Sequence, residues 1–217
     1  MAPHRWLRTT LKAMFDAPAM PAPRCRSVGL AIGGFGFSVI SLGIFATVAF
    51  AERWMYRNLG VPGAYLTWTI LFMLFGGLVF SLLVVDTRKK FRSYALFGAA
   101  FLSYAVGWVA AYFILRGAIG EWVGSLAGSC LMALVIAAGF GALRSAATLS
   151  GLLFAANSAG YFLVSKINDL FGGPMGMLLW GVLYGLFLGA GLGAALYVAQ
   201  SKRGRRAVLG TGTRDAG

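Results

Sequence analysis

The side chains of this chain that could do chemistry are a few uncharged polar groups within long apolar stretches. Asn157 and Ser158 are neighbours in one stretch, and Ser125 and Ser129 lie four residues apart in another, on one face if that stretch is helical. Such groups can hydrogen-bond to one another or to a passing molecule. Two interpretations therefore stay open: these residues join helices, or they line a path for a solute.

Asn157 is the strongest hydrogen-bonding group of this set. An amide left unpaired in hydrocarbon costs several kcal/mol. We therefore expect Asn157 to face the interior of the protein and to find a partner there, such as Ser125 or Ser129.

Arg144 is the only Lys or Arg between residues 119 and 164. We expect it at a tight cytoplasmic turn, where its long side chain reaches the headgroup layer by snorkelling. The alternative is a deeper position, in which the guanidinium holds an anionic headgroup or substrate.

Residue types that usually carry catalysis are scarce. The only histidine, His4, lies outside the apolar stretches, which also hold no carboxylate pair for proteolysis or proton transfer. Cys25 and Cys130 are too few for a disulfide framework or a metal site. Lys166 could form a Ser–Lys dyad, but its neighbours Asn168 and Asp169 indicate an outer loop. We expect no enzyme activity and no metal or other cofactor.

Six apolar stretches have to position these residues. Each is close to the roughly 20 residues that a helix needs to cross about 30 Å of hydrocarbon. Apart from Glu121 they contain no Asp, Glu, Lys, Arg or His. We therefore expect an all-α, polytopic integral membrane protein, a bundle of six transmembrane helices. The stretches are residues 28–51, 64–85, 93–115, 119–141, 146–164 and 175–199.

The distribution of charge predicts the orientation. The chain has 19 Lys and Arg against 6 Asp and Glu, and 15 of the 19 fall on one side if both tails share that side. Because cytoplasmic loops carry the excess of Lys and Arg, both termini are expected in the cytoplasm, the N-in/C-in topology. Anionic lipid headgroups at that face, rather than nucleic acid, are the expected partners of these cations. The expected location is a bacterial-type plasma (inner) membrane.

The two ends of the chain differ from the central part, residues 27–199. Residues 1–26 form a basic segment in which Trp6, Leu7, Leu11, Met14 and Phe15 recur at helical spacing. This predicts an amphipathic helix on the cytoplasmic headgroups, with a disordered basic leader as the alternative. Residues 200–217 are rich in Gly and Arg, so a disordered basic tail is predicted.

The first apolar stretch also allows a second interpretation. Ala49-Phe50-Ala51 resembles a signal-peptidase site after a basic leader. The apolar core of a signal peptide is only about 7–15 residues, however, and this one is longer and begins only after position 27. An uncleaved anchor is favoured.

Glycines recur every four residues along the last stretch, at Gly181, Gly185, Gly189 and Gly193. Small residues at this spacing let another helix approach closely. The favoured interpretation is helix packing within the chain, and the alternatives are a homo-oligomer contact or a face that lines a pore.

Two classes of function follow from these patterns. The first is non-enzymatic passage of a small solute or lipid through the helix bundle. The alternative is a structural or assembly subunit of a membrane complex, which docks other membrane helices through its glycine-rich faces. The first needs a polar path, and the second needs a glycine face exposed to lipid.

Overall fold

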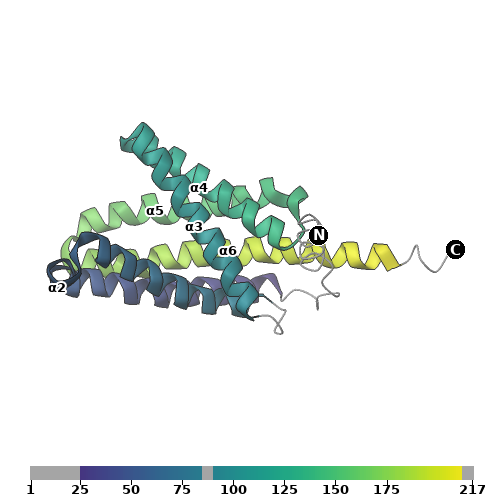
Figure 1. Ribbon diagram of the computed structural model, residues 1–217, viewed down its shortest axis with the longest axis horizontal. Coiled ribbons are helices and arrows are strands. Elements are labelled where there is room, and N and C mark those ends of the chain that lie inside the picture. Colours follow the sequence, from purple (N-terminus) through teal and green to yellow (C-terminus); the bar gives the residue numbers. More distant parts are fainter. Residues whose placement is uncertain (1–24, 85–89, 212–217) are drawn as a thin grey trace, which may run out of the picture.

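The computed structural model describes residues 25–84 and 90–211, and they fold almost entirely into helices (Figure 1). Five helices of this described part are long and apolar enough to cross a membrane. The predicted all-α class is therefore confirmed, and the five long apolar helices are consistent with a membrane bundle. The predicted amphipathic helix falls on residues 1–24, which lie outside the described part of the chain. The elements are α2 (Arg26–Leu83), α3 (Lys90–Leu115), α4 (Gly117–Gly139), the 3₁₀ turn η2 (Leu143–Ser145), α5 (Ala146–Phe171) and α6 (Gly173–Thr211).

Helix α2 consists of two arms joined by a sharp bend at Gly60. A straight helix of its 58 residues would be about 87 Å long, far more than the bilayer core. Gly60 breaks the helix with φ 67° and ψ 172°, a conformation that side chains disfavour. Pro62 follows in the first turn of the second arm, where its missing N–H is tolerated.

The two arms of α2 lie antiparallel. Near the bend, the indole Nε1 of Trp68 donates a hydrogen bond of 3.0 Å to Oγ1 of Thr47. Farther from the bend, Gly36 lies against Val79, whose methyl groups come within 2.7 Å of where a Cβ on Gly36 would be. Contacts at both depths show that residues 26–59 and 61–83 form a helical hairpin.

Two further hairpins follow, each closed by a turn in the left-handed region. Arg116 (φ 54°) and Gly117 (φ 57°) turn α3 into α4, and Gly172 (φ 61°) with Gly173 (φ 51°) turns α5 into α6. Three of these four residues are glycines, which tolerate this region at little cost and so permit short connections. Arg116 is the one non-glycine residue with a positive φ in the described part of the chain. The turn at η2 joins α4 to α5 and places Arg144 at an exposed position.

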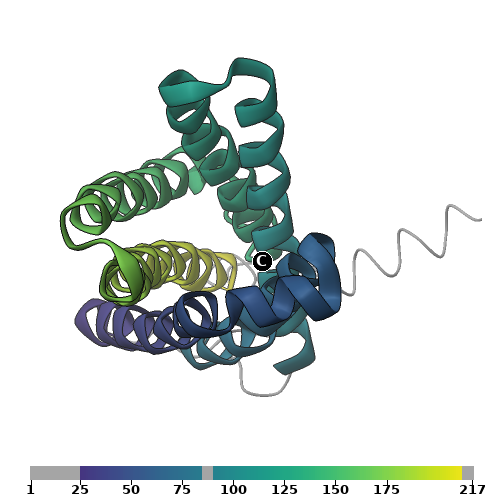
Figure 2. The same cartoon turned by 90° about the vertical axis from the view of Figure 1, so that its left-hand side faces the viewer.

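Helix α6 lies between the first arm of α2 and α5, and the three run side by side (Figure 1). The α3–α4 hairpin crosses this layer obliquely and rises away from it, as the end-on view shows (Figure 2). A phenylalanine core fills the space where α2 and α3 meet: Phe37, Phe80 and Phe97 are fully buried, with ring centroids 5.4–5.7 Å from Phe97.

The glycine face of α6 lies directly on the first arm of α2. A Cβ at Gly181 would come within 2.9 Å of the carbonyl oxygen of Ser41. Gly185, Gly189 and Gly193 meet the backbone of the same arm in the same way, at the carbonyl oxygens of Phe37, Gly33 and Gly29. Next to this contact the hydroxyl of Ser38 donates a 2.7 Å hydrogen bond to the carbonyl of Val182.

The structure differs from the sequence predictions where helices end. The tail predicted to be disordered from residue 200 is helical as far as Thr211, because no proline interrupts it and Lys, Arg, Ala and Leu are good helix formers. Helix α5 continues to Phe171, so Lys166, Asn168 and Asp169 lie in a helix rather than in a loop.

Candidate functional site

Three helices bring polar side chains together in the middle of the bundle, three of them buried and one, a tyrosine, half-buried. We call this group the Asn157 cluster: Ser125 of α4, Asn157 and Ser158 of α5, and Tyr184 of α6. Nδ2 of Asn157 donates to Oγ of Ser125 at 2.9 Å, and the hydroxyl of Tyr184 donates to Oδ1 of Asn157 at 2.9 Å. The hydroxyls of Ser125 and Ser158 lie 2.8 Å apart. The bond predicted between Asn157 and Ser125 is therefore present.

The packing of α5 against α6 explains why Tyr184 reaches Asn157. Gly160 lies one turn along α5 from Asn157, and a Cβ there would come within 3.0 Å of Phe187 and 3.3 Å of the Tyr184 ring. The missing side chain lets α6 approach closely enough for the tyrosine hydroxyl to meet the amide. Since Asn157 is only 2% exposed, these hydrogen bonds satisfy a polar group that water does not reach.

Two residues predicted as site candidates stand apart from this cluster. Oγ of Ser129 is buried and has no hydrogen-bond partner among the described residues, although it shares a face of α4 with Ser125. Arg144 is exposed at the η2 turn, and Asn157 lies 11 residues into α5, about 17 Å along the helix. The exposed position agrees with the interfacial interpretation of Arg144 and separates it from the cluster.

A cavity of about 270 Å³ adjoins the Asn157 cluster, and Tyr184 belongs to both. Tyr104, on α3, lines the cavity together with Tyr184. Most other lining residues are aliphatic or aromatic. The lining residues are Ser41, Ile44, Phe45, Phe72, Phe101, Tyr104, Ala105, Trp108, Val109, Tyr184 and Leu188.

The chemistry of this cavity is that of an apolar space with a polar side. Tyr104, Tyr184 and Ser41 can exchange hydrogen bonds with a ligand, and no Asp, Glu, Lys, Arg or His lines the cavity. An ion that entered this cavity would lose its hydration and find no opposite charge to replace it. A molecule with a large apolar part and one or two polar groups therefore fits best.

Sequence reasoning missed Tyr104, Tyr184 and Ser41. Tyrosine in a membrane protein is usually attributed to the headgroup boundary. A signal was nevertheless present, because Tyr104 and Tyr184 lie near the middle of their apolar stretches, 93–115 and 175–199, where a hydroxyl needs a partner. Comparison with family models, with curated proteins and with solved structures finds no match to this chain.

Proposed function

We propose that the chain crosses a membrane six times, with both termini in the cytoplasm. Two arms of α2 with four further helices account for six spans, and the charge distribution supports the orientation. One side-chain contact fits the same arrangement. Nε2 of Gln200 donates to the carbonyl of Leu83 at 3.3 Å, so the end of α2 and this part of α6 would fall on one side of the membrane in the proposed topology.

Within this topology, we propose that the protein provides non-enzymatic passage for a small amphiphile, a molecule with a long apolar part and a compact polar group. The observation that carries this proposal is the cavity beside the Asn157 cluster, apolar over most of its surface and bordered by three hydroxyl groups. Its volume of about 270 Å³ lies just below the usual range of small-molecule sites, which suits part of one lipid chain better than a bulky solute.

The alternative, docking of partner helices through the glycine face of α6, has less support. This face already lies against α2 of the same chain, so another helix could reach it only if α2 moved away. The glycine contact therefore supports packing within the chain over a homo-oligomer interface.

Filling the cavity tests the proposal. Ala105 lines it, whereas Ala110 on the same helix is exposed and does not. In proteoliposomes that contain a fluorescent phospholipid, we expect wild-type protein and Ala110→Phe to speed the movement of label between leaflets, measured by dithionite quenching. Ala105→Phe should abolish the movement, because the ring occupies the space for the chain.

Two results would contradict the proposal. One is passage no faster than in protein-free vesicles; the other is equal passage by Ala105→Phe and Ala110→Phe. Thermal unfolding in detergent checks that both variants are folded.

A further inference from the structure

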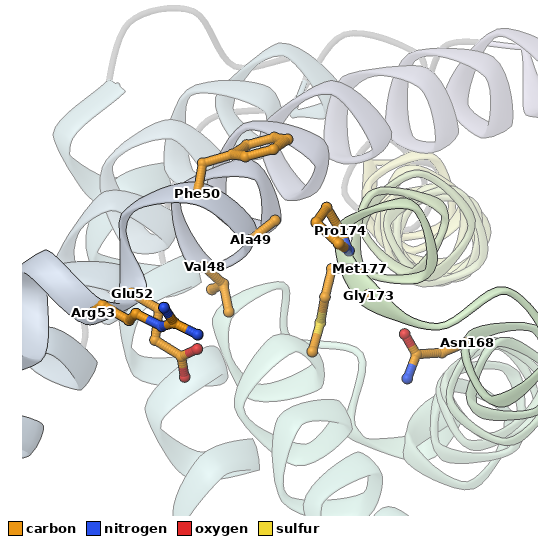
Figure 3. A pocket seen from close by; sticks show the side chains of 9 residues that line it. All are labelled: Val48, Ala49, Phe50, Glu52, Arg53, Asn168, Gly173, Pro174 and Met177. Carbon is orange, nitrogen blue, oxygen red and sulfur yellow. The ribbon is translucent and has the colours of Figure 1, made fainter.

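A second cavity, of about 520 Å³, lies at the end of the molecule where α2 bends and α5 turns into α6. Figure 3 shows Glu52 and Arg53 on one side of it, the carboxamide of Asn168 on the other, and Met177 between them. In the proposed topology this outer pocket opens to the external headgroup layer. Its lining residues are Val48, Ala49, Phe50, Glu52, Arg53, Asn168, Gly173, Pro174 and Met177.

The outer pocket presents one negative and one positive group. No salt bridge joins Glu52 to Arg53 in the described part of the chain. Glu52 is half-buried, and its carboxylate can accept several hydrogen bonds at once. The Arg53 side chain is exposed. Both charges can therefore meet a ligand.

Asn168 adds a neutral polar group opposite the two charges. Its side chain lies against Gly176, and its Oδ1 is buried without a hydrogen-bond partner among the described residues. The amide nitrogen of this side chain can donate to a phosphate oxygen.

The outer pocket and the central cavity lie along the same faces of two helices. On α2, Ser41 and Phe45 border the cavity, and Val48 and Glu52 border the outer pocket, at offsets of 4, 7 and 11 residues from Ser41 that keep them on one face. On α6, Met177 borders the outer pocket, and Tyr184, seven residues on, borders the cavity.

An aromatic pair stands between the two spaces. The rings of Phe45 and Trp180 stack with centroids 6.2 Å apart and an interplanar angle of 15°. Trp180 lies between Met177 and Tyr184 along α6, so a chain that moved from the outer pocket to the cavity along this face would have to pass the pair.

We propose that the outer pocket binds the zwitterionic headgroup of a phospholipid, with the phosphate at Arg53 and the ammonium at Glu52, and so holds the lipid at the entrance to the central cavity. The inference rests on the proposed function, because the cavity supplies the reason for holding a lipid there. Opposite charges in one pocket favour a zwitterion over an anionic lipid, whose phosphate would face Glu52 with no amine to balance it.

Native mass spectrometry of the full chain in detergent tests this proposal without any passage of lipid. The probes are dioleoyl phosphatidylethanolamine, dioleoyl phosphatidylglycerol, and soluble phosphoethanolamine as a competitor. We expect Arg53→Gln to raise the apparent Kd for the ethanolamine lipid about tenfold, because one hydrogen bond between charged groups is lost. Glu52→Gln should make the apparent Kd values for the ethanolamine lipid and the glycerol lipid equal, because the group that binds the ammonium is lost. Arg57→Gln, an exposed neighbour that does not line the pocket, should change neither.

The outcomes separate this inference from the proposed function. Equal binding by Arg53→Gln, Glu52→Gln and Arg57→Gln would overturn the headgroup site even if lipid passage is found. Displacement of the lipid by an equimolar amount of phosphoethanolamine would overturn the lipid as the ligand in favour of a soluble phosphate ester. Selective binding without passage would leave the site standing and contradict only the proposed function.

Discussion

Asn157 shows how one residue can connect three helices. Its amide donates to Ser125 on α4 and accepts from Tyr184 on α6, while its own helix is α5. The Asn157–Ser125 contact could be predicted from the sequence, because an amide in hydrocarbon needs a partner. The part played by Tyr184 could not, because it depends on how α6 is rotated against α5, which Gly160 permits.

A double-mutant cycle tests the contact between Asn157 and Tyr184. Asn157→Leu leaves the Tyr184 hydroxyl without its acceptor, and Tyr184→Phe leaves Oδ1 without its donor. We expect each single variant to lower the free energy of unfolding by about 0.6–2 kcal/mol, the range found for hydrogen bonds between membrane helices. The double variant should lose less than the sum, with a coupling energy of at least about 0.5 kcal/mol. Strictly additive losses, from unfolding in mixed detergent micelles, would show that the bond contributes nothing.

Among the helices, the apolar stretches could be predicted from hydropathy, and the helix ends could not. Hydropathy marks where a helix lies in hydrocarbon, whereas its ends depend on breaking residues. Gly60 ends the first arm of α2 at the edge of a polar segment that is otherwise helical. Helix α6 continues to Thr211 because no helix-breaking residue interrupts it. The spacing of the glycines indicated a packing face, but not that α2 is the helix that covers it.

The glycine contact between α2 and α6 leads to a prediction about stability. A leucine at Gly185 would meet the backbone of Phe37 and Ser38, so we expect Gly185→Leu to lower the free energy of unfolding by more than about 2 kcal/mol. Gly43→Leu is the matched control, since Gly43 is helical and exposed with nothing within 4 Å of an added Cβ. That variant should stay within about 0.5 kcal/mol of wild type. Similar melting temperatures for the two variants would be evidence against the packing contact.

At the scale of the whole molecule, two spaces lie along one side of the α2–α6 pair. The central cavity needs α2, α3 and α6 at once, and the outer pocket needs the first arm of α2 together with the α5–α6 turn. Neither could be predicted from the sequence, because each depends on the relative positions of helices that are distant in the chain. Their alignment, with Phe45 and Trp180 between them, is the basis for proposing a lipid route.

The central claim is that a lipid chain occupies the cavity beside the Asn157 cluster. Photolabelling tests it most directly: the protein is reconstituted with a phospholipid that carries a diazirine in its acyl chain, irradiated, digested and mapped by mass spectrometry. We predict adducts on Tyr104, Trp108 and Tyr184, in addition to background on lipid-facing residues, and loss of the cavity adducts in Ala105→Phe. Adducts confined to exposed positions such as Val106 and Phe113, with Tyr104, Trp108 and Tyr184 unlabelled, would contradict the account.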